Sequence, residues 1–294
     1  MIYLSPVTRY PLLLMRVFNN FEEAKGKIKN AVVTTGSFDG VHIGHKEIVK
    51  RLNSIAQDIG GESVVVTFNP HPRILLYPDQ KDLKLINTLE EKTMLLERAG
   101  LKNLIVVNFT LEFSKIPSDS FITRHIAGDL GAKVLVASYN HQFGHKRQGD
   151  RDFLYQLANK HDFRIEEIPM QQINKETISS TKIRKALFRG DVETANSYLG
   201  YEYFMIGNIK LYKGEGYEAC ESVYEFQVDD SNKLLPPEGA YEIKLSFEDK
   251  AIQGKAILDN NRKIVVEIGN DTGINKERNN CMIIFLKNLN SKEP

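Results

Sequence analysis

Two histidines in a glycine-rich segment are the residues of this sequence best suited to chemistry. The segment Gly36–His45 reads GSFDGVHIGH and follows an apolar run over residues 31–35. Glycines let a backbone approach phosphate oxygens, and the free N–H groups of a helix start attract anions. His42 and His45 are three residues apart, so both can lie on one side of the first helical turn and donate to the same phosphates. The segment therefore predicts a site for the triphosphate of ATP.

A second segment, ISSTKIR at residues 178–184, has the same character. Ser180 and Thr181 stand at a predicted helix start, where hydroxyl residues usually cap the helix. Capping and phosphate binding are compatible here, because a capped helix start still offers N–H groups to an anion. Arg184, one turn further on, can hold the β- and γ-phosphates with its planar guanidinium.

A stiff turn, Asn69–Pro72, follows the second predicted strand. Its two prolines fit a purely structural loop. The alternative is a loop that contacts a substrate, with His71 directed into the site. The residues leave both interpretations open.

The elements that must position these residues alternate between short apolar runs and amphipathic stretches. Strands are predicted at residues 31–35, 63–68, 103–107, 133–137 and 164–168. Helices are predicted at 44–59, 89–99, 118–130, 151–161, 181–189 and 192–199. Alternating strands and helices predict an α/β fold, with a parallel sheet covered by helices on both faces. Ligands of such sheets bind beyond the carboxyl ends of the strands, where the loops after two predicted strands meet.

After residue 200 the pattern changes to short strands separated by turns rich in Gly, Asn, Asp and Pro. The predicted strands are 203–212, 223–228, 240–247, 255–258, 263–268 and 282–286. Roughly six such strands predict a small antiparallel barrel or sandwich. The predicted division is a leader over residues 1–14, a nucleotide-binding domain over 15–200 and a barrel domain over 201–294.

Composition narrows the possible partners and the compartment. The formal net charge is +1, so there is no general field for nucleic acid or an anionic membrane. The two cysteines, Cys220 and Cys281, are predicted to be free thiols in a reducing cytoplasm. The run over residues 11–15 is too short to span a membrane. Two segments rich in Lys and Glu, 90–92 and 182–189, are predicted to be solvated helix faces.

Five motifs in order give the sequence a family resemblance. They are GSFDGVHIGH (36–45), TFNPHP (67–72), NFTLEFSKIPSDSFI (108–122), FGHKRQGD (143–150) and ISSTKIRKALFRGDVETANSYLG (178–200). In these motifs the sequence resembles the prokaryotic bifunctional riboflavin kinase/FAD synthetases. The resemblance implies a Rossmann-like HxGH nucleotidylyltransferase domain that transfers AMP from ATP to FMN. It implies Mg²⁺ with ATP, FMN as acceptor and FAD as product.

The resemblance also assigns roles to single residues. It implies that His42, His45 and Arg184 are catalytic. The remaining ATP-binding residues that it implies are Gly36, Phe38, Gly40, Gly44, Ser180 and Thr181. The flavin-side residues that it implies are His71, Pro72, Asn140 and Arg147.

Two departures from the family pattern leave alternatives open. Asn140 replaces an acidic residue, which removes a charge, and Gln142 replaces a common Arg. The stretch 220–227 lacks the Pro-Thr-x-Asn segment of the kinase barrels, although Pro237–Tyr241 keeps a landmark of that barrel. We therefore expect an FMN adenylyltransferase without riboflavin kinase activity. The alternatives are a catalytically weakened flavin- or nucleotide-binding paralogue with a sensing or regulatory role, and a transferase that acts on another phosphorylated acceptor. No nucleic acid or membrane partner is expected, and the oligomeric state is not predicted.

Overall fold

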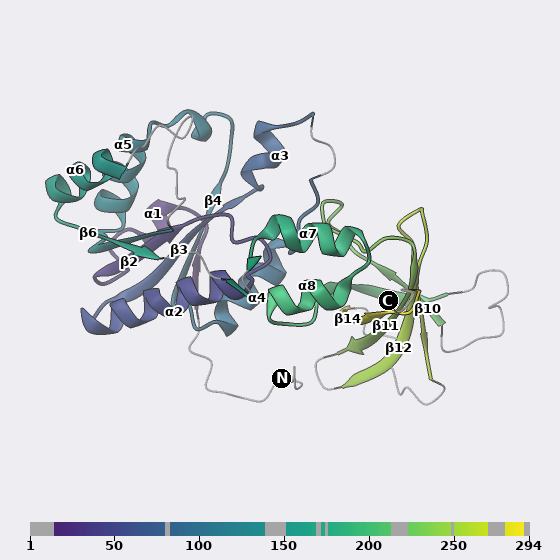
Figure 1. Ribbon diagram of the computed structural model, residues 1–294. Coiled ribbons are helices and arrows are strands. Elements are labelled where there is room, and N and C mark those ends of the chain that lie inside the picture. The colour runs from purple at the N-terminus through teal and green to yellow at the C-terminus, as the bar shows by residue number, and fades with distance from the viewer. Residues whose placement is uncertain are drawn as a thin grey trace. The chain divides into compact units, whose positions relative to one another are not determined.

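The protein is described by a computed structural model over residues 15–79, 83–138, 151–168, 172–173, 176–212, 223–247, 250–269 and 280–290 (Figure 1). These residues form two compact units. The sheet unit takes in the described residues of 15–83 and 92–177, and the barrel unit those of 84–91 and 178–290. Residues 178–200 thus group with the barrel, while the predicted domain ranges themselves stay a prediction.

The sheet unit is built on a parallel sheet of six strands. They are β1 (Arg16–Phe18), β2 (Ala31–Thr35), β3 (Glu62–Asn69), β4 (Asn103–Asn108), β5 (Val134–Ser138) and β6 (Arg164–Ile168). Their order is β1-β4-β3-β2-β5-β6, and every neighbouring pair is parallel. The five predicted strands and the parallel α/β fold are confirmed. Strand β1 was not predicted, because three residues with two exposed side chains carry no strand pattern.

Helices connect the strands of this sheet. They are α1 (Phe21–Ala24), α2 (Ile43–Asp58), α3 (Pro72–Leu76), α4 (Leu89–Arg98), η1 (Phe113–Lys115), α5 (Ser118–Phe121), η2 (Ile122–Asp129) and α6 (Arg151–His161). A small hairpin, β7 (Gln172–Ile173) with β8 (Glu176–Thr177), follows β6. The helix predicted at 118–130 is correct in place but is α-helical only at its start and π-helical over η2. The short helices α1 and α3 were not predicted.

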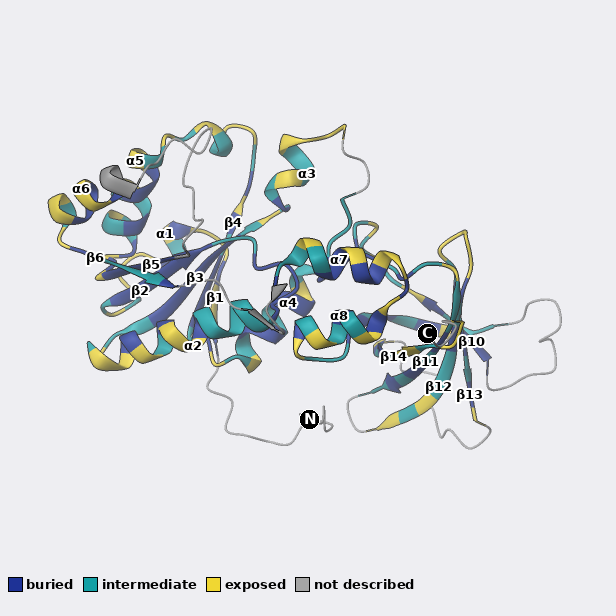
Figure 2. Ribbon diagram, viewed as in Figure 1, coloured by how far each residue is buried: buried dark blue, intermediate teal, exposed yellow. Residues whose placement is uncertain are grey.

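The core of the sheet unit lies on both faces of the sheet. Val33, Val64 and Ile105 join a buried cluster with side chains of α1, η2 and α6. Successive strand residues point to opposite faces, so Val32 and Val65 face the other side, where α2 packs against β2 and β3. Figure 2 shows these strands as the most buried elements of the unit.

The barrel unit contains a closed antiparallel barrel, as predicted. Its strands are β9 (Phe204–Leu211), β10 (Val223–Gln227), β11 (Gly239–Ser246), β12 (Ala251–Leu258), β13 (Ile264–Ile268) and β14 (Asn280–Asn288). The order β10-β13-β12-β11-β14-β9 closes on itself. The landmark tyrosine Tyr241 is fully buried, and its hydroxyl donates to the carbonyl of Pro237 over 3.0 Å. Burial raises the pKa of Tyr241 to about 12.

Two helices, α7 (Ser180–Phe188) and α8 (Val192–Leu199), pack on this barrel. The amide of Asn196 in α8 donates to the carbonyl of Phe285 in β14 over 3.0 Å. Asn288 likewise donates to the carbonyl of Gly190, between the two helices, over 3.0 Å. The barrel therefore holds α8 and the turn before it, and α7 packs against α8.

A buried ion pair ties the start of α4 to the barrel strands. Lys233 Nζ lies 2.5 Å from Glu91 Oε2, and neither side chain is exposed to solvent. The ammonium also donates to the carbonyls of Ile86 and Phe204, at 2.6 Å and 2.9 Å. Glu91 Oε1 accepts from the backbone N–H of Ile206. The prediction that Glu91 is a solvated helix residue is wrong, because this charge satisfies a buried ammonium.

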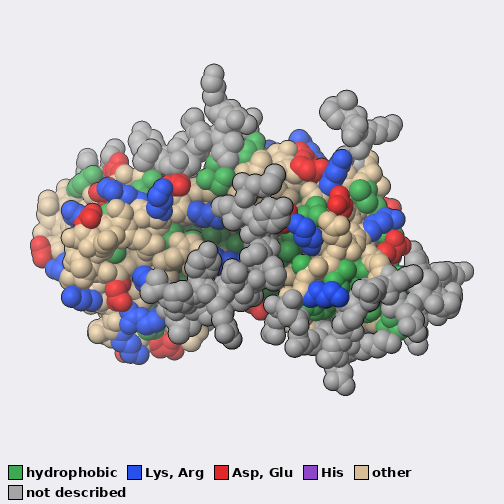
Figure 3. Space-filling view, turned by 90° about the horizontal axis from the view of Figure 1, so that it is seen from below, with side chains coloured by type: hydrophobic (Ala, Val, Ile, Leu, Met, Phe, Trp, Pro, Cys, Tyr) green, Lys and Arg blue, Asp and Glu red, His purple; other side chains and the backbone are tan. Residues whose placement is uncertain are grey.

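On the face seen in Figure 3, basic and acidic side chains are interspersed over the described surface. In the described part of the chain, the helices are too short or too polar to cross a membrane. Cys281 is a buried free thiol whose pKa is raised to about 12 by burial, whereas Cys220 lies outside the described residues.

Candidate functional site

The glycine-rich loop leaves the carboxyl end of β2 and enters α2 through a strained backbone. Phe38 has φ +48° and Val41 has φ +33°, in the left-handed region that L-residues rarely adopt. Between them Gly40 takes φ +91°, which a residue with a Cβ would resist. A Cβ at Gly36 would approach the Phe38 ring to 3.2 Å. Strain of this kind costs of order 1–3 kcal/mol per residue and collects at functional sites.

Both histidines lie where this loop becomes helix. His42 is the N-cap of α2, and its Nδ1 accepts the backbone N–H of His45 over 3.4 Å. Since Nδ1 is an acceptor, the neutral ring carries its proton on Nε2. The rings of His42 and His45 stack with centroids 3.8 Å apart, and Phe38 lies 4.7 Å from His45. The predicted placement of both imidazoles on one side of the first turn is thereby confirmed.

The surroundings of the imidazoles favour their neutral forms. Burial lowers the pKa of His42 to about 4. The negative charge of Asp39 partly opposes this shift, and the positive charge of Lys46 adds slightly to it. Burial, followed by the charges of His42 and Lys92, holds the pKa of His45 well below its usual range. Nδ1 of His45 is buried and has no hydrogen-bond partner among the described residues. A buried polar atom without a partner costs about 1–3 kcal/mol, which an oxygen of a bound ligand can relieve.

Because the pKa of His42 is lowered in the folded protein, acid is expected to destabilise the sheet unit. The unfolded chain, with its ordinary pKa near 6.5, binds more protons than the folded chain between about pH 6.5 and 4. The stabilisation is therefore complete above pH 6.5 and is lost as the pH falls toward 4. The shift corresponds to about 3 kcal/mol of unfolding free energy.

This expectation can be measured by urea unfolding between pH 7 and pH 4. His42→Asn keeps a capping side chain but cannot titrate, so the variant should lose about 3 kcal/mol less than the wild type over this range. An identical pH dependence in both proteins would contradict the assignment.

The turn after β3 is positioned by its own histidine. His71 is buried and is the N-cap of α3, with Nδ1 accepting the N–H of Arg73 over 3.2 Å. Pro72 is the first residue of that helix, and the Asn69–Pro70 peptide bond is cis. His71 thus has a structural role, and its predicted contact with a substrate stays a prediction.

Three apolar side chains near this turn were missed from the sequence. Leu76 and Tyr77, at the end of α3, are 43% and 48% exposed, and Leu111, shortly after β4, is 51% exposed. Strands β3 and β4 are neighbours, so both segments follow the same carboxyl edge of the sheet. These residues show no periodic pattern, since they lie at the end of a five-residue helix and in a loop.

The ISSTKIR segment begins α7 in the barrel unit. The N-cap is Ser179, whose hydroxyl accepts the N–H of Lys182 over 3.3 Å, and Ser180 and Thr181 are the first helical residues. Arg184 is 8% exposed, and its Nε donates to the carbonyl of Lys84 over 2.9 Å. The prediction that residues 182–189 form a solvated face is therefore wrong at Arg184.

The predicted site residues are thus divided between different parts of the chain. The histidines belong to the sheet unit and Arg184 to the barrel unit. Their joint contact with one triphosphate accordingly stays a prediction. Asn140, Gln142 and Arg147 lie outside the described residues.

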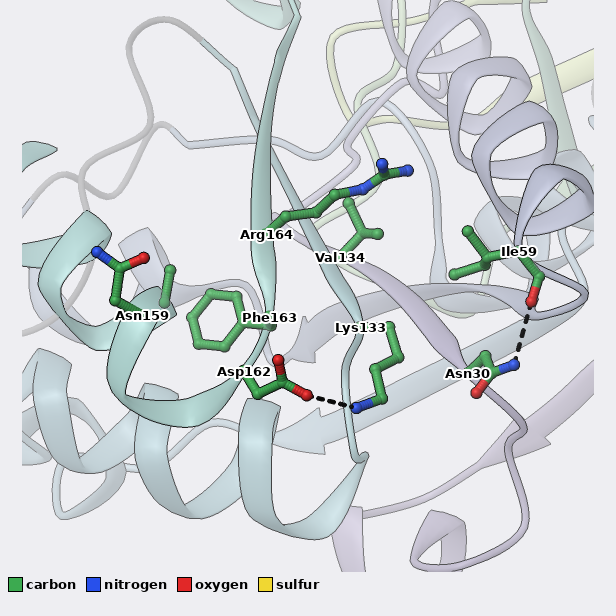
Figure 4. A pocket seen from close by; sticks show the side chains of 9 residues that line it. Asn30, Ile59, Lys133, Val134, Asn159, Asp162, Phe163 and Arg164 are labelled. Atoms are coloured by element: carbon green, nitrogen blue, oxygen red, sulfur yellow. Dashed lines mark hydrogen bonds and ion pairs between the residues drawn. The ribbon is translucent and has the colours of Figure 1, made fainter.

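Two surface hollows lie away from the glycine-rich loop. One, of about 550 Å³, is found at the amino ends of β5 and β6, where Lys133 and Asp162 form an ion pair (Figure 4). The other, of about 1010 Å³, lies beside α1 and η2 and is lined by Asn108 and His125. Neither hollow includes a residue of the loop. Within the described residues no group of three His, Cys, Asp or Glu side chains could hold a metal ion.

Comparisons with known proteins show which sequences and folds this chain resembles. The sequence model of the FAD synthetase family matches residues 24–182, which is more than half of the chain. A bifunctional riboflavin kinase/FMN adenylyltransferase of Listeria monocytogenes is 30% identical over 232 residues, covering 79% of this chain and 73% of that protein. An FAD synthetase of the same organism is 31% identical over 180 residues, covering 61% of this chain and 72% of the relative.

A solved structure extends the likeness over both units. The crystal structure of a Streptococcus pneumoniae protein described as a macrolide-efflux protein has a TM-score of 0.81 and 25% sequence identity, covering 96% of this chain and 92% of that chain. The structural likeness thus includes the barrel, whereas the family match ends at residue 182. The extent of the family match and the identity to these relatives place the chain in the FAD synthetase family.

Proposed function

We propose that the protein is an FMN adenylyltransferase, which converts ATP and FMN into FAD and pyrophosphate. The observation that carries the proposal is the pair of stacked, neutral imidazoles at the start of α2, one of which has a buried Nδ1 without a partner among the described residues. Membership of the FAD synthetase family supports the same reaction. A phosphate oxygen of FMN attacks the α-phosphorus of ATP, and the bond from that phosphorus to the departing pyrophosphate breaks.

The protein would contribute alignment and charge rather than a covalent intermediate. In this proposal Nε2–H of His42 donates to a phosphate oxygen, and His45 donates to a second one. Phosphate binding would raise the pKa of both rings, because a nearby anion favours the imidazolium. The imidazoles would therefore bind the phosphates most strongly in the transition state, in which negative charge develops on the departing pyrophosphate.

The remaining nucleotide contacts are proposed from the family motifs. Gly36, Gly40 and Gly44 would keep the loop backbone close to the phosphates, and Phe38 would shape the site by packing against His45. Further ATP contacts are proposed for Ser180, Thr181 and Arg184. Magnesium would arrive bound to the phosphates of ATP and keep most of its waters.

The flavin side of the site is proposed at the loops after β3 and β4. His71 and Pro72 would border it, and the exposed apolar side chains of Leu76, Tyr77 and Leu111 offer a surface that the isoalloxazine ring could cover. Asn140 and Arg147 are proposed on the same side from the sequence alone.

We also propose that riboflavin kinase activity is lost. The chain keeps the barrel and its buried Tyr241, but the sequence at 220–227 lacks the Pro-Thr-x-Asn segment. The barrel would then serve as support for α8 and, through α8, for α7. The domain ranges 15–200 and 201–294 and the cytoplasmic location are part of this proposal.

The proposal is tested by incubating the purified chain with ATP, Mg²⁺ and either FMN or riboflavin, followed by chromatography of the flavins. FAD from FMN, with no FMN or FAD from riboflavin, is the expected result. Product from riboflavin would contradict the loss of kinase activity. Bound flavin without any product would favour the sensing paralogue, and neither binding nor product would indicate another acceptor.

A further inference from the structure

A lysine that no motif includes lies beneath the glycine-rich loop. Lys92, in the sheet-unit part of α4, is 6% exposed. Its Nζ donates to Thr67 Oγ1 over 3.4 Å. An ammonium in the protein interior is costly unless a negative group offsets its charge.

Thr67 connects this ammonium to the loop itself. The hydroxyl of Thr67, at the end of β3, accepts from Lys92 and donates to the carbonyl of Ser37 over 3.2 Å. Thr67 is fully buried, so this short relay has a fixed position under the loop. One hydroxyl therefore connects the ammonium of Lys92 to the backbone of Ser37 in the glycine-rich loop.

The charged and titratable neighbours of Lys92 include His45, which is proposed to bind phosphate. The carboxylate of Asp39, 1% exposed, partly offsets the lowering of the Lys92 pKa by burial. The charge of Lys92 in turn acts on His45, whose Nδ1 is buried without a partner in the described part of the chain. The other titratable groups nearby are His42, which acts on His45, and Lys46, which acts on His42.

Resting on the proposed adenylyl transfer, we propose that Lys92 is a positioning residue of the ATP site. Its buried ammonium, fixed through Thr67 to the backbone of Ser37, supplies a positive charge under the loop that favours binding of the triphosphate by His45. Lys92 acts through the loop and the imidazole and does not itself touch the nucleotide. A purely structural role would affect the binding of ATP and FMN alike. The proposed role instead predicts that loss of Lys92 weakens the binding of ATP and leaves the binding of FMN unchanged.

The test compares Lys92→Met with Lys133→Met, in the full-length protein. Lys133 is half-exposed at the opposite edge of the sheet and pairs with Asp162, so its variant loses the same charge from the same unit. Affinity for Mg-ATP is measured by calorimetry without FMN, kinetic constants by FAD formation, and the titration of His45 by NMR. Thermal unfolding checks that each variant is folded.

In Lys92→Met the Kd for ATP should rise about 10- to 100-fold, because an interaction with a charged group is lost. The KM for FMN should stay within about twofold of the wild-type value. The pKa of His45 should rise, because the charge that helps to lower it is gone. Lys92→Arg should recover part of the ATP affinity, and Lys133→Met should behave as the wild type.

Wild-type ATP affinity in Lys92→Met would overturn the inference. A loss shared equally by ATP and FMN, with an unchanged titration of His45, would assign Lys92 a purely structural role. If Lys92→Met does not fold, Thr67→Val replaces it in the test, because it breaks the hydrogen bonds between Lys92 and Ser37. Thr67→Val is expected to raise the Kd for ATP, and unchanged affinity would again overturn the inference.

The outcomes also separate this inference from the proposed function. A wild type that makes FAD, beside a Lys92→Met variant that binds ATP equally well, refutes this inference alone. A wild type that binds ATP without making FAD refutes the proposed function alone, and a wild type that does not bind ATP refutes both.

Discussion

Replacing His42 by asparagine is expected to lower kcat/KM for FAD formation by about 100- to 1000-fold. Asparagine is a good N-cap residue, so it can still accept the N–H of His45 at the start of α2. It cannot, however, place an imidazole Nε2–H on the phosphates or stack on His45. The measurement is steady-state FAD formation at saturating FMN, with circular dichroism as a check on folding.

A matched histidine gives the control for this variant. His161, in α6 of the same unit, accepts or donates a hydrogen bond with Thr123 Oγ1 at 3.2 Å and takes no part in the proposed site. His161→Asn should therefore keep kcat/KM within about twofold of the wild-type value. A His42→Asn variant that is as active as His161→Asn would show that the imidazole contributes nothing beyond its cap.

Lys233, the buried lysine of the barrel unit, is expected to make a large contribution to the free energy of unfolding. Lys233→Met should lower the free energy of unfolding by about 3–5 kcal/mol, because it leaves Glu91 charged and buried without its counter-ion. The loss also includes the contact of the ammonium with the Tyr203 ring, 4.6 Å from its centroid. Denaturation in urea, followed by circular dichroism, measures the change.

Two further variants separate this burial effect from the mere loss of a charge. In Lys233→Met with Glu91→Gln the remaining group is neutral and can still accept the N–H of Ile206, so part of the loss should be recovered. Lys244→Met removes an ion pair with Glu202 whose side chains are 32% and 34% exposed, and should cost at most about 1 kcal/mol. Equal losses in Lys233→Met and Lys244→Met would contradict the account.

The fold and the first half of the site follow from local features of the sequence. Val32 and Val33 belong to an uninterrupted apolar run, which is typical of a strand buried on both faces, and the glycine-rich segment after it fixes where α2 begins. Because His42 and His45 lie three residues apart at that helix start, their common direction was predictable from spacing alone.

The charges inside the protein could not be predicted in this way. In the segment 90–92 charged residues follow one another, a pattern that usually indicates a solvated face. Glu91 and Lys92 are nevertheless buried, since partners distant in sequence, Lys233 and Thr67, compensate their polar groups. Likewise, Arg184 looks solvated in sequence, whereas its guanidinium binds the carbonyl of Lys84, 100 residues away. Such pairings depend on tertiary structure, which the local pattern does not contain.

Isotope labels in ATP test most directly whether the protein transfers AMP from ATP to FMN. The wild-type chain is incubated with FMN and Mg²⁺, once with ATP labelled at the α-phosphate and once with ATP labelled at the γ-phosphate. Adenylyl transfer predicts that the α-label appears in FAD and that the γ-label appears only in pyrophosphate. A flavin that carries the γ-label, or the absence of any labelled flavin under these conditions, would contradict the account.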